Sequence, residues 1–555
     1  MSQCDEVVSG ATQSSGHAED PCWPLLAFSD ASAHNHASRY HHESAAGSSP
    51  LDASDTDSAS SSRAASSPGL VRVLGPRIAT AVVVGSVIGS GIFLKPGNIA
   101  GESGQFGVII TVWVFGGVLC ILGGLCFAEL ATMYPSAGGL YVYLREAYGK
   151  PVAFLFGWTE VFFGKPASNG ALSMAFVGSF SLALGVRLSP VVEVSLAIAV
   201  IVIMAWVNVI GVLWGGRLQM VVTVIKVVFL GLVATIPFLL IPFAKESIDV
   251  ANYATTVAPR QSDLAAQVGV VLLAVMWAYN GWHGITPLAE EVRDPQRSIP
   301  LSLFFGIGIL IALYLAANFA YHGVLSMSEM KTAGDHAAEV MLKKLFGQHG
   351  LTAMSAVIMC STFGAINTNL LQAPRITFAM GRDQVFFRSL GTVHATFRTP
   401  AVSIAVMAVM SIALILGVAV AKQMVIDRTT DAVTVTQLSD EVPQQLWPLI
   451  IASLRNGSIF SLLTNFVIFS ASIFYMLGVL AVIVLRFRRP DIHRPYRTWG
   501  YPWVPLVFLI VYVWFMLQIY RSNPLESRTG LVFIALGVPA LLAYRYTVSR
   551  RTVHH

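Results

Sequence analysis

The sequence is organised around one stretch, Gly85-Ser86-Val87-Ile88-Gly89-Ser90-Gly91-Ile92-Phe93, which lies inside the first long apolar run. Three glycines within two turns disfavour a regular helix, because glycine loses the most backbone entropy on ordering. In a membrane, unpaired backbone is tolerated only where it lines a cavity or is buried in protein. The pattern therefore predicts a spanning helix that breaks in the middle of the bilayer.

Such a break can form a binding site from backbone atoms alone. The first half-helix leaves unpaired carbonyls, the second leaves unpaired amides, and the two helix dipoles end at one point. We expect the amides of Ser90, Gly91 and Ile92 to face a carboxylate, and the carbonyls near Val87 and Ile88 to face an ammonium. A small zwitterion fits these requirements.

A second interpretation of the same glycines remains open at this point. Gly85 and Gly89 stand four residues apart, which is the spacing of a face that lets two membrane helices approach closely. On this interpretation the stretch marks helix packing and binds nothing. The segment by itself does not decide between the two.

Composition indicates a polytopic membrane protein. Of the 555 residues, 55% are hydrophobic and only 12% are charged, and the mean hydropathy is +0.65. These values are far from those of soluble globular proteins. The net charge of +5 comes mostly from short loops between apolar runs, so the expected partner is the lipid bilayer and not a nucleic acid.

Roughly twelve apolar runs are long enough to span a membrane as helices, which predicts an all-α fold. The runs start near Ile78, Gly107, Val152, Val191, Leu218, Gln267, Pro300, Leu351, Pro400, Ile459, Val504 and Leu531. If both termini share one side, that side collects the basic loops, and the positive-inside rule makes it the cytoplasm. The basic residues are Arg145, Lys150, Arg217, Arg293, Arg297, Arg382, Arg388, Arg398, Arg486, Arg488, Arg489, Arg494, Arg497, Arg545, Arg550 and Arg551.

Four regions follow from this pattern. Residues 1–70 are polar and of low complexity, which predicts a disordered cytoplasmic tail without a signal peptide. Residues 71–243 and 244–485 would hold helices one to five and six to ten, and residues 486–555 the last two helices. Residues 422–457 form a long polar outer loop, interpreted as a tolerated insertion or a cover for the pathway.

Neither the histidines nor the cysteines predict a metal site or a cofactor. Four histidines in the tail could bind a metal, but a solvated low-complexity segment is the preferred interpretation. The cysteines show no metal-ligand or disulfide spacing. These residues are His34, His36, His41 and His42, and Cys4, Cys22, Cys120, Cys126 and Cys360.

The sixth run carries a second interruption. Residues 275–284 place Asn280, Gly281, His283 and Gly284 where hydrocarbon is expected, and Pro287 follows. Runs one and six correspond if the core is two repeats of five helices. Two interrupted helices at corresponding positions are the best sequence indication of an inverted-repeat transporter with a site at the membrane midplane.

The sequence also resembles the amino acid–polyamine–organocation superfamily of permeases, and within it the L-type branch. The resemblance covers Val71 to about Tyr546. It rests on the order and spacing of several motifs: residues 85–93, Ala128-Glu129-Leu130, Tyr134-Pro135-Ser136-Ala137-Gly138-Gly139, Trp158-Thr159-Glu160 with Lys165-Pro166, Glu290-Glu291 with Asp294-Pro295, and Leu485-Arg486-Phe487-Arg488-Arg489-Pro490 with Arg494-Pro495-Tyr496.

The resemblance implies inverted five-helix repeats with broken helices 1 and 6, two peripheral helices, and a site between the breaks. The substrate carboxylate would bind the amides of Ser90 and Gly91, and the amine would bind the carbonyls of Ile88, Trp277 and Tyr279. The predicted substrate-binding set is Ile88, Gly89, Ser90, Gly91, Trp277, Ala278, Tyr279 and Asn280.

The resemblance also suggests residues that gate or couple transport. Trp277 occupies the position of an aromatic gate, with a packed or lipid-facing aromatic as the alternative. His283 is a candidate for a pH-dependent inner gate, although a neutral, hydrogen-bonded histidine in a packed pathway is the preferred interpretation. Lys226 matches a lysine that replaces a structural sodium ion in relatives, so it is predicted to couple transport to protons or to support exchange. The alternative is that Lys226 extends to the membrane surface.

Two further expectations concern the predicted third helix and the residues that follow it. Glu160 and Lys165 lie five residues apart, which puts them on different faces of an α-helix, each with its own partner. Residues 185–190 lack the cysteine that links light chains of heteromeric transporters to a heavy chain, so no disulfide-linked heavy chain is expected.

The sequence therefore predicts a secondary active amino acid transporter, a symporter or an antiporter, in the plasma membrane. One alternative is a membrane sensor that binds the substrate without moving it. Another is a transporter of polyamines or organic cations, which would leave the amides of Ser90 and Gly91 without a carboxylate. An intramembrane enzyme has little support, since no metalloprotease, nucleophile-elbow or phosphate-loop motif is present.

Overall fold

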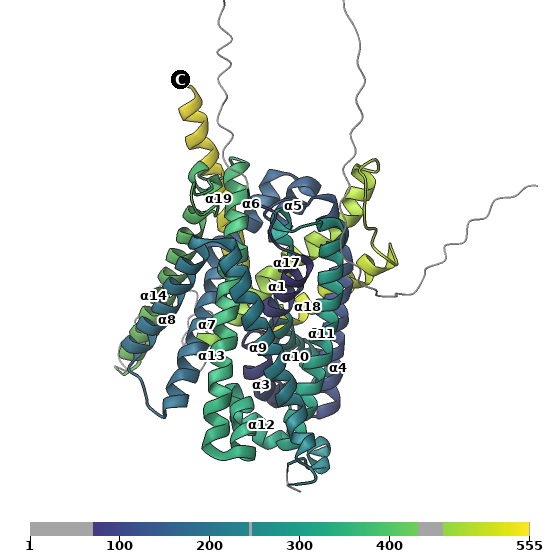
Figure 1. The fold of residues 1–555 in the computed structure, drawn as a ribbon, viewed down its shortest axis with the longest axis vertical. Coiled ribbons are helices and arrows are strands. Elements are labelled where there is room, and N and C mark those ends of the chain that lie inside the picture. The colour runs from purple at the N-terminus through teal and green to yellow at the C-terminus, as the bar shows by residue number, and fades with distance from the viewer. Residues whose placement is uncertain (1–69, 244–246, 431–458, 554–555) are drawn as a thin grey trace, which may run out of the picture. The chain divides into compact units, whose positions relative to one another are not determined.

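Helices form almost all of the computed structural model, which describes residues 70–243, 247–430 and 459–553 (Figure 1). The first half contains α1 (Pro76–Val87), α2 (Gly91–Leu94), α3 (Pro96–Ser103), α4 (Phe106–Met133), α5 (Leu140–Tyr148), α6 (Lys150–Thr159), η1 (Glu160–Gly164), α7 (Lys165–Leu184), α8 (Pro190–Ile210) and α9 (Val212–Leu239). The second half contains η2 (Val250–Ala254), α10 (Leu264–Tyr279), η3 (Thr286–Glu291), α11 (Pro295–Val324), α12 (Met327–Ala333), η4 (Gly334–His336), α13 (Ala337–Arg382), η5 (Arg388–Gly391), α14 (Ala401–Thr430), α17 (Ile459–Arg488), α18 (Trp503–Ser522) and α19 (Pro524–Val553).

The predicted number of spanning helices is confirmed. Within the described ranges, 11 helical segments are long and apolar enough to cross a membrane. The twelfth span contains α10, which is apolar but has only 16 residues because it is interrupted. Helix starts agree with the sequence to within a few residues for most spans, whereas α13 begins earlier because it includes a preceding segment that bends at Gly347.

The bundle has two distinct ends (Figure 1). The short helix α5 and the C-terminal part of α19 lie at one end, and α3 and α12 lie at the opposite end. We call these the α5 end and the α12 end.

Three pairs of helices that correspond in the two predicted repeats pack on each other. Helix α4 packs on α11, α7 on α13, and α8 on α14. Counted along the chain, these pairs join the second span to the seventh, the third to the eighth and the fourth to the ninth. This is the pattern expected for two related five-helix units. The boundaries at residues 71–243 and 244–485 stay predictions.

The predicted break in the first span is confirmed, and the alternative packing face is present at Gly85 but not at Gly89. Helix α1 ends at Val87, and α2 begins at Gly91. A Cβ atom on Gly85 would run into the side chains of Gln219 and Thr223 on α9. Gly85 therefore permits close helix packing, while the residues after it form the break.

Some predictions lie outside the described residues. These are the tail up to residue 69, with the four histidines considered for a metal site and two cysteines, and residues 431–458 of the long polar loop. One boundary needs correction, since α14 continues to Thr430 and the first part of the predicted loop, residues 422–430, is helical.

We predict that Gly91→Ala destabilises the fold, whereas Gly89→Ala does not. A Cβ on Gly91 would overlap the backbone of Ala278 on α10, and overpacking of this kind costs about 1–3 kcal/mol. A Cβ on Gly89 would make only ordinary contacts, 3.6 Å from the Ala365 Cβ and 3.7 Å from Leu172. Thermal unfolding of the two purified variants in detergent tests this, and equal unfolding temperatures would contradict it.

Candidate functional site

The second predicted break is also present. Helix α10 ends at Tyr279, and Asn280 leaves helical geometry with ψ 137°. Gly281 then adopts φ +99°, a conformation that favours glycine, and a Cβ there would lie 2.9 Å from the Ser86 carbonyl oxygen. The chain continues in the short 3₁₀ helix η3. Glycine at position 281 thus allows the sixth span to turn directly against α1.

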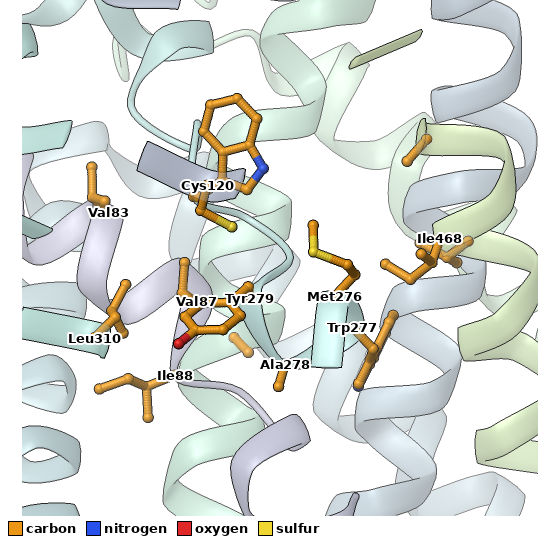
Figure 2. Packing of buried hydrophobic residues seen from close by; sticks show 14 of the residues in the cluster. Val83, Val87, Ile88, Cys120, Met276, Trp277, Ala278, Tyr279, Leu310 and Ile468 are labelled. Atoms are coloured by element: carbon orange, nitrogen blue, oxygen red, sulfur yellow. The ribbon is translucent and has the colours of Figure 1, made fainter. Parts of the chain in front are cut away.

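The two breaks meet in the core of the bundle. The Tyr314 hydroxyl on α11 lies 2.9 Å from the Val87 carbonyl and 3.1 Å from the Ala278 carbonyl, so it bridges the ends of α1 and α10. Figure 2 shows Val87 and Ile88 of the first break close to Ala278 and Tyr279 of the second. The predicted juxtaposition of the two interruptions is therefore correct.

The backbone amides and carbonyls at the breaks differ in whether they have hydrogen-bond partners. The amides of Ser90, Gly91 and Ile92 have no hydrogen-bond acceptor among the described residues. The Trp277 carbonyl accepts a hydrogen bond from the Asn280 amide at 3.1 Å. The site therefore presents three donors at the start of α2, where a carboxylate was predicted to bind.

Lys226 occupies the carbonyl side of the first break. Its side chain is fully buried, and its Nζ donates to the Ile88 carbonyl at 2.7 Å and the Gly85 carbonyl at 3.2 Å. The interior placement of Lys226 is confirmed, and the alternative of an extension to the membrane surface is wrong. This ammonium fills the place of a cation at the end of α1.

The predicted acceptors for the substrate amine are not equally free. The Ile88 carbonyl accepts from Lys226 at 2.7 Å, and the single proton of the Ser361 hydroxyl is shared between the Ile88 carbonyl at 3.1 Å and the Gly89 carbonyl at 2.9 Å. The Tyr279 carbonyl accepts no hydrogen bond from the described residues. Of the predicted acceptors, the Tyr279 carbonyl is thus the one with no described hydrogen-bond donor, although Tyr279 does not line the central cavity.

A small cavity of about 30 Å³ lies at the breaks. A volume of this size holds one or two water molecules, so the conformation is closed around the backbone groups. Five predicted residues line it: Gly89, Ser90, Gly91, Trp277 and Asn280. Sequence reasoning missed Ser86, Ser168, Leu172, Ala365, Asn369 and Gln372, and it did not place Lys165 at the site.

Trp277 lies between this cavity and the α12 end. Its indole nitrogen is 3.4 Å from the Ser90 hydroxyl, across the two broken helices. A larger cavity of about 820 Å³ opens toward the α12 end and reaches Leu273 and Ala274, about one turn before Trp277. This position is consistent with the predicted gate, which remains a prediction.

Glu160 and Lys165 contact each other, and the prediction that each has a separate partner is wrong. Five residues on an α-helix are about 140° apart, but Glu160 begins a π-helical turn whose bonds join residues i and i+5. Their charged atoms lie 3.9 Å apart. Lys165 lines the central cavity, and a small adjoining cavity toward the α5 end contains Glu160, Lys165 and His283.

Asn280 and His283 both contact Tyr475 of the tenth span. The Asn280 side-chain oxygen Oδ1 accepts a hydrogen bond from the Tyr475 hydroxyl at 2.9 Å. His283 packs against the rings of Phe127, Trp282 and Tyr475, and its Nδ1 has no partner among the described residues. The structure thus packs His283 among aromatic rings, as the preferred interpretation expected, but shows no hydrogen bond to its Nδ1, and its gating role remains a prediction.

The site is closed toward the α5 end by ion pairs and backbone bonds. Arg375 on α13 and Glu291 at the end of η3 are both almost completely buried and pair at 2.9 Å. The Glu291 carbonyl accepts the amides of Val73 and Leu74, which lie just before α1. These bonds tie the beginning of the first span to the inner end of the sixth.

The chain matches the sequence model of the amino acid permease family over residues 74–540. It belongs to this family. The predicted resemblance to the permease superfamily and its L-type branch is confirmed.

Several curated relatives cover most of this permease. It is 31% identical over 444 residues to the serine/threonine exchanger SteT of Bacillus subtilis, which covers 79% of this chain and 89% of the relative. It is 28% identical over 488 residues to the mouse b(0,+)-type amino acid transporter 1, covering 85% and 89% of the two chains. The human cystine/glutamate transporter is 26% identical over 465 residues, covering 83% and 82%.

We predict that the pair at the α5 end is a major determinant of the permease's stability. Glu291→Gln leaves Arg375 buried without a counter-charge, which typically costs about 3–5 kcal/mol. The matched control is Arg382→Gln, which removes a pair between Glu290 and an Arg382 side chain that is 51% exposed, and we expect a cost of about 0–1 kcal/mol.

Thermal unfolding in detergent measures both effects. We expect the double variant Glu291→Leu with Arg375→Met to be more stable than Glu291→Gln alone, because no buried charge is left unpaired. Equal unfolding temperatures for Glu291→Gln and Arg382→Gln would contradict the prediction.

Proposed function

We propose that this permease moves amino acids across a membrane by alternating access around the two helix breaks. The observation that carries the proposal is the set of three free amides at Ser90, Gly91 and Ile92, beside a cavity at the midpoint of the bundle. Backbone amides at a helix N-terminus bind a carboxylate well. The names of the relatives, which are exchangers and transporters of amino acids, support the same substrate class.

The substrate amine would bind the free carbonyl of Tyr279, with Asn280 and Lys165 near the substrate side chain. This assignment changes the expected role of Ile88, whose carbonyl would remain with Lys226. Lys226 would hold the break in position in each transport cycle. A proton carried by Lys226 would be required only if the uptake experiment shows proton coupling.

We propose that the α5 end faces the cytoplasm of a plasma-membrane protein. Arg145, Lys150 and Arg382 lie at this end, as do the arginines that follow α17, and basic residues favour the cytoplasmic side. We further propose that the protein works without a disulfide-linked heavy chain, since residues 185–190 contain no cysteine. The substrate-binding role, and not catalysis, would explain the buried polar groups at the breaks.

Uptake into proteoliposomes tests the function and the type of coupling. Proteoliposomes that contain the wild-type protein are given external radiolabelled amino acids under an imposed proton or sodium gradient. The measurement is made with and without amino acid inside the vesicles. Uptake that requires internal amino acid indicates exchange, and uptake driven by the proton gradient alone indicates symport.

Two outcomes of that experiment would overturn the proposal. Binding of an amino acid without flux under any condition would make the protein a sensor. Competition by polyamines that lack a carboxylate, at concentrations similar to amino acids, would favour an organic cation transporter.

Lys226→Ala is expected to stop uptake in either coupling mode, because it leaves the Ile88 and Gly85 carbonyls without their ammonium.

We predict that Ser90→Pro weakens substrate binding, whereas Ser90→Ala preserves it. Ser90 has φ −81°, close to the value that proline imposes, so proline removes the amide hydrogen with little change of the backbone. Loss of one hydrogen bond to a carboxylate costs about 1.5–3 kcal/mol, or roughly 10–150-fold in affinity. Alanine removes only the hydroxyl and keeps the amide.

Substrate-induced thermal stabilisation measures this affinity, and unfolding without substrate controls for the fold. If Ser90→Ala loses as much affinity as Ser90→Pro, then the hydroxyl and not the amide binds the substrate. The proposed carboxylate site would then be wrong.

A further inference from the structure

An apolar groove lies on the bundle between α17, α18 and α19, away from the helix breaks. Its volume is about 430 Å³, and its accessible lining is entirely apolar. It is bounded by Phe469 and Leu480 on α17, by Leu509 and Tyr520 on α18, and by Leu531 on α19. This volume is within the range of ligand-binding clefts.

The groove is one leaflet deep. On α17 it extends from Phe469 to Leu480, and on α18 from Leu509 to Tyr520. Eleven residues of α-helix rise about 16 Å, which is close to half of a hydrocarbon core of about 30 Å. A partner helix would contact a stripe through the full membrane, whereas a lipid acyl chain ends near the midplane.

Polar side chains mark the mouth of the groove at the α12 end. Tyr520 is 41% exposed, and tyrosine is enriched at the level of lipid headgroups. Arg521 follows Leu517 of the lining by four residues, and Arg528 precedes Leu531 by three, so each arginine lies about one turn from a lining residue of its helix. Both arginines are exposed, and Glu526 is the acidic residue between them.

We propose that this groove binds an anionic phospholipid from the leaflet at the α12 end. One acyl chain would lie between Phe469, Leu480 and Leu509, and the phosphate would contact Arg521 and Arg528. Arginine recognises phosphate through paired hydrogen bonds, and each basic residue near a membrane surface favours anionic lipid. The proposal depends on the membrane-spanning fold and not on the identity of the transported substrate.

Native mass spectrometry of the full-length protein tests the site. The protein is reconstituted in equal amounts of phosphatidylglycerol and phosphatidylcholine and then stripped of lipid by stepwise detergent washing. We expect one phosphatidylglycerol to remain on the wild type after bulk lipid is removed.

Two tryptophan variants on α18 distinguish lipid binding in the groove from lipid binding elsewhere on the same helix. Val513→Trp fills the groove, since Val513 belongs to its lining and is 47% exposed. Val507→Trp is the matched control, because Val507 is 46% exposed on the same helix and is not part of the lining. We expect roughly tenfold less retained lipid in Val513→Trp and no change in Val507→Trp.

The double variant Arg521→Gln with Arg528→Gln tests the headgroup. We expect a roughly fivefold to tenfold loss of preference for phosphatidylglycerol over phosphatidylcholine. Equal retention in the two tryptophan variants, or no retained phospholipid on the wild type, would overturn the proposal. A wild-type dimer that Val513→Trp converts to a monomer would also overturn it, since the groove would then bind a second copy of the chain.

Discussion

The need to satisfy broken backbone inside a bilayer is the constraint on which the rest of this structure depends. Each interruption exposes carbonyls and amides that have no water to bind, so neighbouring helices must supply partners. Lys226, Ser361 and Tyr314, from three different helices, provide hydrogen bonds to carbonyls at the ends of α1 and α10. The position of these helices around the breaks therefore follows from a hydrogen-bond requirement.

The hydrogen-bond partners are divided unequally between the carbonyls and the amides of the breaks. This difference determines which charge the site binds. Most carbonyls at the breaks are already occupied, whereas the three amides at the start of α2 are free. Such a site binds a carboxylate more readily than it binds an additional cation. This asymmetry favours amino acids over polyamines, which carry only the positive groups.

The sequence could predict the breaks but not everything that surrounds them. Glycines at 85–91 and at 281–284 interrupt apolar runs, so their effect is visible without the structure. The ion pair of Glu160 and Lys165 was not predictable from spacing, because a π-helical turn changes which residues share a face. Asn369 and Gln372 reach the cavity from a helix whose rotation depends on packing with α7. Asn367, nearby on the same helix, instead bonds Asn208 and Gln219 away from the cavity.

The two ends of the pathway are closed by interactions of very different strength. Toward the α12 end, the Trp277 indole lies between the site and a wide cavity, with its nitrogen 3.4 Å from the Ser90 hydroxyl. Toward the α5 end, the buried Arg375–Glu291 pair and the backbone bonds of Val73 and Leu74 must separate before the inner halves of the broken helices can move. Separation of a buried ion pair costs several kcal/mol. Opening at the α5 end therefore carries the cost of this pair, which interactions with a bound substrate would have to offset.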